Sequence, residues 1–180
     1  MQSLQGKLLI ASSVLMDPNF VQTIILMVQH DENGALGLVL NRPLNTTVKE
    51  ACEEALETPC AITSHLFQGG PCEGPLMVLH GEDLSGQMEV ISGVHFTTQR
   101  DEIEGLLDRP NVQAKFFVGY SGWSAGQLEG EMETGSWLTV PATTDLIFSD
   151  DEGRWKQLIK EIVLGQYIDP KRIPDDPSVN

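Results

Sequence analysis

The segment from residue 119 to residue 137 constrains the fold of this chain more than any other stretch of its sequence. It reads GYSGWSAGQLEGEMETGSW and holds five glycines and two tryptophans, directly after the apolar run 116–118. Glycine allows a positive φ and lets a second chain segment approach closely, whereas tryptophan brings a large apolar surface. We therefore expect a backbone bend packed with aromatic side chains, which is mainly architecture and also lines a pocket.

The spacing of the residues in this segment does not match the motif of a nucleophilic serine. A nucleophile elbow needs G-x-S-x-G, and residues 119–123 place Trp123 where the last glycine must stand. The segment also holds no histidine that could act as a base for Ser121. We therefore predict no catalytic residue, and Ser121 is not expected to be a nucleophile.

The second half of the segment predicts a short helix. Ser124 and Gln127 match S-x-x-Q, in which the serine caps the helix and the glutamine reaches back to the cap amide. Gly135 would end the helix with a positive φ. Glu129 and Glu133 lie four residues apart and would repel each other slightly, so a nearby cation would favour this pair.

Short strands and helices alternate irregularly along the rest of the chain. The predicted strands are Lys7–Ala11, Ile24–Gln29, Leu36–Asn41, Leu76–His80, Met88–Ile91, Ala114–Gly119 and Trp137–Val140. Asn33-Gly34 predicts a tight hairpin turn between the second and third of them. Helices are predicted after the capping box at 47–50, over 99–107, and from Asp150 or Asp151 to Gly165, the last with an apolar stripe at 155, 158, 159, 162 and 163. This pattern favours an α+β fold over a regular βαβ repeat.

The charge of the chain restricts its partners. It has 26 acidic against 11 basic residues and a formal net charge of −15. Phosphate backbones are bound by clustered lysine and arginine, and no stretch of this sequence concentrates them. Direct DNA binding is therefore disfavoured.

The length of the chain indicates a single domain, and its cysteine content indicates a reducing compartment. A chain of 180 residues is most simply a single domain, here 1–168, followed by a Pro- and Asp-rich tail at 169–180 that is loose or lies on the surface. No apolar run approaches the length of a membrane span. The odd set Cys52, Cys60 and Cys72 is typical of reduced thiols, so we expect a cytoplasmic protein.

Ordered sequence blocks over residues 6–165 resemble the bacterial YqgE/AlgH family. The blocks are GKLLIA at 6–11, DPNF at 17–20, GALGLVLNRP at 34–43, QGGP at 68–71, GYSGWSAGQLEGE at 119–131 and GSW at 135–137. The chain departs from the family in three places. Relatives usually have proline at the position of Ser13, often alanine at that of Ser121, and commonly a small aliphatic residue at that of Cys72.

The resemblance implies a single α+β domain in which a branched, mixed β-sheet curls into a small barrel with helices around it. The family includes a protein linked to transcriptional control of alginate synthesis, which implies a regulatory role. It offers no catalytic residue set that could be transferred to this chain.

Several of these blocks supply the residues of a candidate pocket. The candidates are Asn41, Arg42, Gly69, Gly70, Tyr120, Trp123, Gln127, Glu129 and Glu131. Arg42 ends an apolar strand, so it either pairs with a nearby carboxylate for structural reasons or meets Glu129 or Glu131 in the pocket. Gly69-Gly70 precedes a strand rather than a helix, which favours a tight turn over a phosphate-binding loop.

Metal and cofactor binding have little support in the sequence. The four histidines are scattered and no C-x-x-C motif occurs, so we predict no metal and no cofactor. Cys52 lies on an apolar helical stripe and is expected to be inert, whereas Cys60 and Cys72, near prolines, are expected to be accessible.

These observations lead to three hypotheses about function. The first is a non-catalytic cytosolic protein that binds an unknown protein or small molecule and takes part in regulation, including that of transcription. The second is an enzyme whose site is built from Arg42, Gln127, Glu129 and Glu131. The third is a regulator that binds DNA directly, which the net charge of −15 disfavours.

Overall fold

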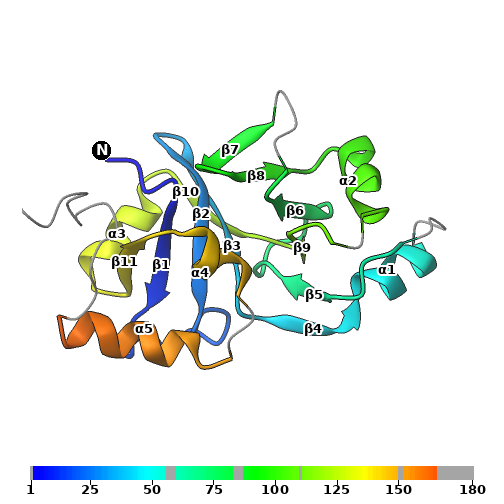
Figure 1. Cartoon of the computed structure of the whole chain (residues 1–180). Coiled ribbons are helices and arrows are strands. Elements are labelled where there is room, and N and C mark those ends of the chain that lie inside the picture. Colours follow the sequence, from blue (N-terminus) through cyan, green and yellow to red (C-terminus); the bar gives the residue numbers. More distant parts are fainter. Residues whose placement is uncertain (1, 56–59, 83–86, 110, 150–151, 166–180) are drawn as a thin grey trace, which may run out of the picture.

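The computed structural model describes residues 2–55, 60–82, 87–109, 111–149 and 152–165 of the chain. Eleven strands and five helices lie within these ranges, and the strands form two sheets (Figure 1). The fold is α+β, as expected, because helices interrupt mainly antiparallel strands at irregular intervals. The predicted tail at 169–180 and the predicted caps Asp150 and Asp151 lie outside the described residues.

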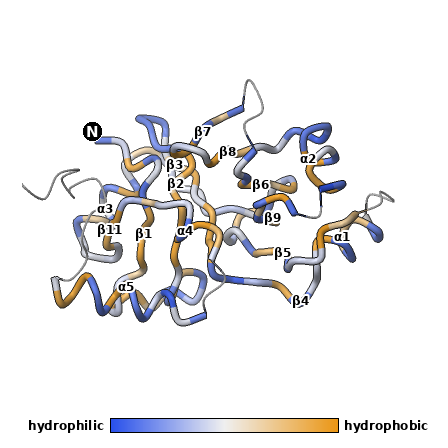
Figure 2. Tube along the Cα trace, in the orientation of Figure 1, coloured by the Kyte–Doolittle hydropathy of each residue, from blue (hydrophilic) through white to orange (hydrophobic). Residues whose placement is uncertain are grey.

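The first sheet has five strands in the order β10-β3-β2-β1-β11, and all its pairings are antiparallel. Its strands are β1 (Lys7–Ala11), β2 (Ile24–Asp31), β3 (Gly34–Val39), β10 (Ser121–Ser124) and β11 (Trp137–Pro141). Alternate residues of β1 and β2 belong to two different apolar clusters, one on each face of the sheet. This double burial explains why these strands are almost continuously apolar (Figure 2).

The second sheet has six strands in the order β4-β5-β9-β6-β8-β7. Its strands are β4 (Pro43–Thr47), β5 (His65–Gln68), β6 (Met77–His80), β7 (Met88–Ile91), β8 (Val94–Thr97) and β9 (Ala114–Val118). The sheet is mixed because β5 and β9 pair in parallel, whereas its other pairings are antiparallel. The described strands do not close into the expected barrel, since β4 and β7 each pair with only one described strand.

The helices cover the sheets in two groups (Figure 1). Their bounds are α1 (Val48–Ala55), α2 (Arg100–Leu107), α3 (Gln127–Glu133), α4 (Thr144–Phe148) and α5 (Arg154–Val163). α1 and α2 share an apolar cluster with β5, β6 and β9 of the second sheet. α4 and α5 pack on one side of the first sheet and α3 packs on the other. None of the helices in the described ranges is long and apolar enough to cross a bilayer.

Local sequence signals account for these helices. The predicted capping box forms at α1, where the Thr47 amide donates to Glu50 at 2.8 Å and the Glu50 amide donates to the Thr47 hydroxyl at 3.2 Å. α2 buries the expected apolar stripe of Ile103, Leu106 and Leu107. In α5 the apolar stripe is shorter than predicted, because Val163 is 74% exposed.

Glycines join the two sheets where residues 69–70 meet residues 119–121. The Gly69 amide donates to the Val118 carbonyl at 2.9 Å, and the Val39 amide of the other sheet donates to the Gly69 carbonyl at 2.9 Å. A Cβ atom on Gly69 would lie 2.3 Å from the Gly119 carbonyl oxygen. Gly119 itself has a φ of +72°, which turns the chain out of β9 toward β10. The glycines therefore permit direct contact between two backbones, which confirms the architectural part of our expectation for this segment.

The hairpin between β2 and β3 forms where the Asn-Gly pair predicts it. Asp31 pairs with Gly34, so Glu32 and Asn33 occupy the turn and Gly34 begins β3. Gly34 has a φ of +138°, and a Cβ atom there would lie 2.3 Å from the Trp123 carbonyl oxygen. This glycine therefore serves both the turn and the close approach of β10.

Candidate functional site

The carboxylate of Glu131 binds the two tryptophans of the glycine-rich segment. One of its oxygens accepts hydrogen bonds from Trp123 Nε1 at 3.0 Å and from Trp137 Nε1 at 2.8 Å. The other oxygen accepts from Gln127 Nε2 at 3.1 Å. Phe20 completes an aromatic cluster, with its ring centroid 6.1 Å from that of Trp123 and 5.6 Å from that of Trp137. Glu131 thus satisfies two largely buried indole N–H groups, which is a structural role.

Glu129 has a partner that the sequence did not reveal. Its Oε1 lies 3.0 Å from Nε2 of His30, a residue of β2 whose side chain is only 2% exposed. The Leu4 amide donates to His30 Nδ1 at 3.0 Å, so Nδ1 is an acceptor and Nε2 must carry a proton and donate to Glu129. The imidazole therefore donates a hydrogen bond to Glu129 as a neutral ring, and it is not the cation that the spacing of Glu129 and Glu133 would favour.

Gln127 forms half of the predicted capping box. Its side-chain oxygen accepts from the Ser124 amide at 3.1 Å, as expected. Ser124 does not cap the helix, because its hydroxyl donates to the same Gln127 oxygen at 3.2 Å and the N-cap position is taken by Gly126. Gly135 ends the segment with the predicted positive φ of +74°.

Ser121 and Tyr120 belong to the junction between the sheets. Ser121 is fully buried and its Oγ donates to the Gly69 carbonyl at 3.2 Å. Tyr120 exchanges two backbone hydrogen bonds with Cys72, at 2.9 and 3.0 Å. The Ser121 hydroxyl is therefore engaged with the backbone, and its lack of a nucleophilic role stays a prediction.

Asn41 and Arg42 hold the loop that precedes β2. Asn41 Oδ1 accepts from the Ile24 amide at 2.9 Å, and Asn41 Nδ2 donates to the Gln22 carbonyl at 2.8 Å. Arg42 donates to the carbonyls of Pro18 and Val21 at 3.1 and 3.3 Å. Burial lowers the pKa of Arg42, and the charge of Asp17 opposes this effect.

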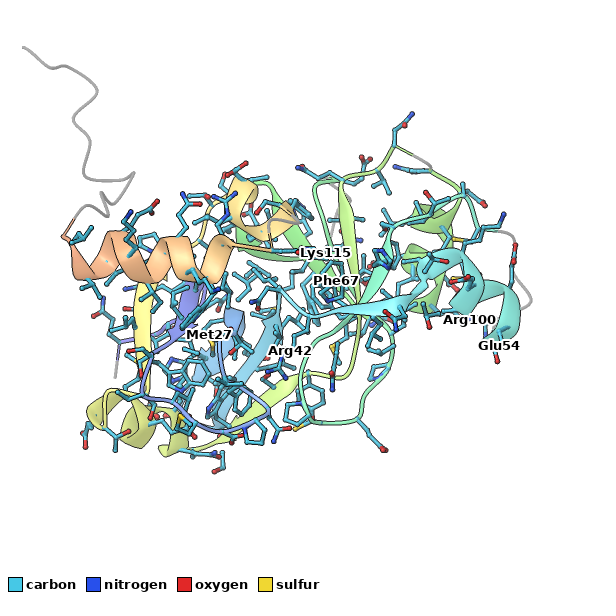
Figure 3. All side chains as sticks on the ribbon, turned by 90° about the horizontal axis from the view of Figure 1, so that it is seen from below. Met27, Arg42, Glu54, Phe67, Arg100 and Lys115 are labelled. Carbon is cyan, nitrogen blue, oxygen red and sulfur yellow. The ribbon has the colours of Figure 1, made fainter. Side chains whose placement is uncertain are left out.

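Among the described residues, Arg42 forms no ion pair with Glu129 or Glu131, which bind His30 and the two indoles instead. Figure 3 shows Arg42 on the side of the molecule where the loop before β2 runs. The inclusion of all nine candidates in one pocket remains a prediction.

The structure contains a cavity of about 370 Å³ where the two sheets meet α4 and α5. Its walls come from the start of β2, the link from β3 to β4, from β5, and from the region around α4 and the start of α5. The lining residues are Ile24, Leu40, Asn41, Pro43, His65, Phe67, Leu146, Ser149, Glu152 and Arg154. Of the nine predicted pocket residues, Asn41 lies in this cavity. Tyr120 and Trp123 line a second, shallower hollow of about 240 Å³ beside the hairpin of β2 and β3.

A buried lysine stands behind the wall of the larger cavity. Lys115 of β9 is 4% exposed, and its Nζ donates to the carbonyls of Leu40 and Ser149 at 3.2 and 3.3 Å. The same ammonium lies 4.3 Å from the centroid of the Phe67 ring. Figure 3 shows Lys115 and Phe67 adjacent to each other at the middle of the molecule. Leu40, Ser149 and Phe67 all line the cavity, so the contacts of Lys115 hold three of the lining residues in place.

The polar groups of the cavity suit recognition of a small molecule. Arg154 lies 4.0 Å from Asp145, a long contact for an ion pair. The Ser149 Oγ is buried and has no hydrogen-bond partner among the described residues. Ligand pockets typically combine apolar walls with a few polar groups that set orientation, and this cavity has that composition. No cluster of three or more metal-ligating side chains occurs within the described ranges.

Two buried histidines stack on each other, and neither of them lines one of the two cavities. His80 of β6 and His95 of β8 stack with their ring centroids 5.8 Å apart, and they are 0% and 8% exposed. Burial, followed by the charge of His95, lowers the pKa of His80, while the charges of Glu102 and Glu82 and the backbone of Glu82 oppose this shift. Neither ring nitrogen of His80 makes a hydrogen bond of standard geometry within the described residues.

We expect this histidine to make the fold less stable in mild acid. Because the native pKa of His80 is below its unfolded value, the unfolded chain binds the proton first as the pH falls below about 6.5. The free energy of unfolding should then drop by up to about 1.4 kcal/mol per pH unit until the native pKa is reached. Urea unfolding at about pH 7.5 and about pH 5.5 measures this loss, and the His80→Leu variant, which lacks the titrating group, should lose less. An equal loss in both proteins would show that His80 is not responsible.

Comparison with known proteins agrees with this fold over nearly the whole chain. The family model described as AlgH-like matches residues 8–165. A UPF0301 protein of Chlorobaculum tepidum is 38% identical over 97% of this chain and 95% of its own length. Another, from Ruegeria pomeroyi, is 37% identical over 87% of this chain and 90% of its own length.

Two solved structures are also similar. The solution structure of the AlgH protein from Pseudomonas aeruginosa has 30% identity and a TM-score of 0.73, covering 92% of this chain and 93% of that one. The crystal structure of protein DIP2367 from Corynebacterium diphtheriae, at 20% identity and a TM-score of 0.71 over 89% of this chain and 88% of that one, shares the fold. The chain therefore belongs to the AlgH-like, UPF0301 family of proteins.

Proposed function

We propose that this protein is a non-catalytic, cytosolic regulatory protein that binds a small molecule in the cavity between the two sheets and α4 and α5. The observation that carries the proposal is the cavity itself, whose volume of about 370 Å³ falls within the usual range of ligand sites. Its apolar walls suit the body of a small organic molecule, and Glu152 and Arg154 in its lining provide polar groups to orient it.

The contacts of three side chains that could take part in catalysis favour binding over catalysis. Glu131 binds two indoles, Glu129 binds His30, and the hydroxyl of Ser121 binds a backbone carbonyl. A general acid, base or nucleophile has to reach a substrate, and these groups are already committed to the scaffold. The proposed enzyme site of Arg42, Gln127, Glu129 and Glu131 thus has less support than the cavity.

A regulatory role is supported by the position of the cavity. Its lining comes from β2 and β5, which belong to different sheets, and from α4, so a bound molecule would touch elements of both halves of the fold. A ligand that binds one arrangement of these elements more tightly would shift the population toward it. The family resemblance to a protein linked to transcriptional control supports regulation, and the net charge of −15 favours action through a protein partner over direct DNA binding.

The proposal is tested by filling the cavity. Leu146→Trp places a larger side chain into the cavity wall, and Leu36→Trp does the same in the shallower hollow. A library of metabolites is screened by thermal denaturation, and the affinity of each hit is measured by calorimetry. We expect Leu146→Trp to weaken binding by about tenfold or more, a loss of at least about 1.4 kcal/mol, and Leu36→Trp to leave it unchanged. Circular dichroism establishes that both variants are folded.

Two outcomes would contradict the proposal. Hits that bind both variants equally well would place their site elsewhere. Turnover of a hit, abolished by Glu129→Gln, would favour the enzyme hypothesis.

A further inference from the structure

The apolar and the charged residues that line the ligand cavity differ in their burial. Three apolar side chains of the lining are almost fully buried, with Ile24 at 3%, Leu40 at 4% and Phe67 at 5% exposed. Glu152, in contrast, is exposed, and the side chain of Arg154 is 21% exposed. The cavity therefore combines an apolar interior with a charged rim at the start of α5. A ligand with an apolar body and a charged head matches this arrangement.

The charged rim carries both signs of charge. Among the described lining residues, Glu152 supplies a carboxylate and Arg154 a guanidinium. The side-chain amide of Asn41, which also lines the cavity, is hydrogen-bonded at both its oxygen and its nitrogen to the backbone of residues 22 and 24. A purely anionic head would be repelled by Glu152 and by the net charge of −15, and a purely cationic head by Arg154. A head that carries both charges can pair with both side chains.

Arg154 can bind a ligand carboxylate in addition to its partners in the protein. Its Nη2 lies 4.0 Å from Oδ2 of Asp145, a side chain that is 83% exposed, and a contact this long and this hydrated contributes little. A guanidinium has five N–H donors in a planar fork, which can hold a carboxylate through two hydrogen bonds. Because Arg154 is the less exposed of the two charged residues, we expect its contact to be the stronger one. An ammonium beside the exposed Glu152 stays partly hydrated.

The size of the cavity limits the size of its ligand. Its volume of about 370 Å³ is near the lower end of the range for small-molecule sites. This volume suits one small molecule rather than a nucleotide or a peptide. An α-amino acid is small enough and carries its ammonium and its carboxylate on the same carbon atom. Its two charges thus lie close together, as do the charged residues of the rim, which are two positions apart in the chain.

We propose that the cavity binds an α-amino acid with an apolar side chain. The apolar side chain lies against Ile24, Leu40 and Phe67, the carboxylate binds Arg154, and the ammonium faces Glu152. This inference rests on the proposed function, because it takes the cavity as the ligand site, and it adds the chemical class of the ligand.

Calorimetry with four matched probes tests this inference on the unchanged, full-length protein. L-phenylalanine is the reference, and we expect it to bind most tightly. L-alanine lacks the apolar body and should bind at least about tenfold more weakly. 2-Phenylethylamine lacks the carboxylate and should also bind at least about tenfold more weakly, because a charge-assisted pair with Arg154 is lost. 3-Phenylpropionate lacks the ammonium and should bind about threefold more weakly, since Glu152 is exposed.

Two variants assign the ammonium contact to its residue. Glu152→Gln removes the partner of the ammonium, so L-phenylalanine and 3-phenylpropionate should bind this variant with affinities within about twofold of each other. Lys156→Gln removes an exposed charge of α5 that does not line the cavity, and it should leave the order of the four probes unchanged. Both residues are exposed, so neither substitution is expected to disturb the folding of the chain.

The results that would overturn the inference are distinct from those that would overturn the proposed function. The inference fails if L-phenylalanine, L-leucine and L-tryptophan all fail to bind at about millimolar concentration, or if 2-phenylethylamine binds as tightly as L-phenylalanine. Either result leaves the proposed function intact as long as another small molecule binds the unchanged protein and is lost in Leu146→Trp. Binding of L-phenylalanine that Leu146→Trp leaves unchanged would place the amino-acid site outside the cavity and would also overturn the inference.

Discussion

Replacing Gly70 by alanine is expected to lower the free energy of unfolding by about 3 kcal/mol or more. A Cβ atom at this position would lie 2.3 Å from the carbonyl carbon of Tyr120 and 2.4 Å from the Ser121 amide nitrogen. Both are backbone atoms, so the clash can be relieved only by separating the chain segments that join the two sheets. The φ of +156° adds strain for any residue with a side chain.

Two other glycines provide matched controls for this effect. Gly126 has a φ of +76° but nothing within 4 Å of its hypothetical Cβ, so Gly126→Ala should cost only about 1 kcal/mol from backbone strain. Gly105 lies inside α2 with open space around it, and Gly105→Ala should stabilise the protein by about 0.5–1 kcal/mol. Urea denaturation measures the free energy of unfolding of the three variants and so ranks the three effects. If Gly70→Ala cost no more than Gly126→Ala, the junction would not be the rigid contact described above.

The second large effect is expected for Glu131→Ala, which should cost about 2–4 kcal/mol. The substitution removes the acceptor of two indole N–H groups, and Trp123 and Trp137 are 5% and 3% exposed. A buried donor left without a partner carries its full desolvation penalty, and here two donors are affected. The short helix α3 also loses the contact from Gln127.

Conservative and neighbouring variants separate this effect from a general weakening of α3. Glu131→Gln keeps an oxygen that can accept both indole hydrogens, so most of the stability should be retained. Glu133→Ala removes an exposed carboxylate of the same helix and should change the stability by less than about 0.5 kcal/mol. Urea denaturation followed by tryptophan fluorescence measures all three. Similar costs for Glu131→Ala and Glu133→Ala would show that the indole contacts contribute little.

The parts of the fold that were predicted from the sequence are those with strong local signals. The apolar runs of β1, β2 and β9 and the capping box at Thr47 predicted their elements because local pattern and tertiary burial agree there. β4 begins with a proline and is mostly polar, and β10 reads SGWS, so neither has a strand signal of its own. These segments become strands through partners far away in the sequence, β5 and β3 respectively.

The cavity could not be predicted for a related reason. Its lining comes from segments spread between Ile24 and Arg154, and no local motif unites them. One signal was available in the sequence: Lys115 stands in the otherwise apolar strand AKFFV, where a charged residue requires buried partners. Similarly, His30 at the end of an apolar strand was the missing partner of Glu129. The composition of the glycine-rich segment alone indicates a backbone contact and an aromatic cluster, and therefore an architectural role.

The proposed ligand site is the cavity beside α4 and α5, whereas the glycine-rich segment serves the scaffold. Amide chemical-shift mapping by NMR with a ligand from the screen tests both parts in one measurement. We expect the largest shifts at cavity residues such as Leu40, Phe67, Leu146 and Ser149, and little change at residues 119–137. The largest shifts at Trp123, Glu129 or Glu131, with the cavity residues unaffected, would contradict it.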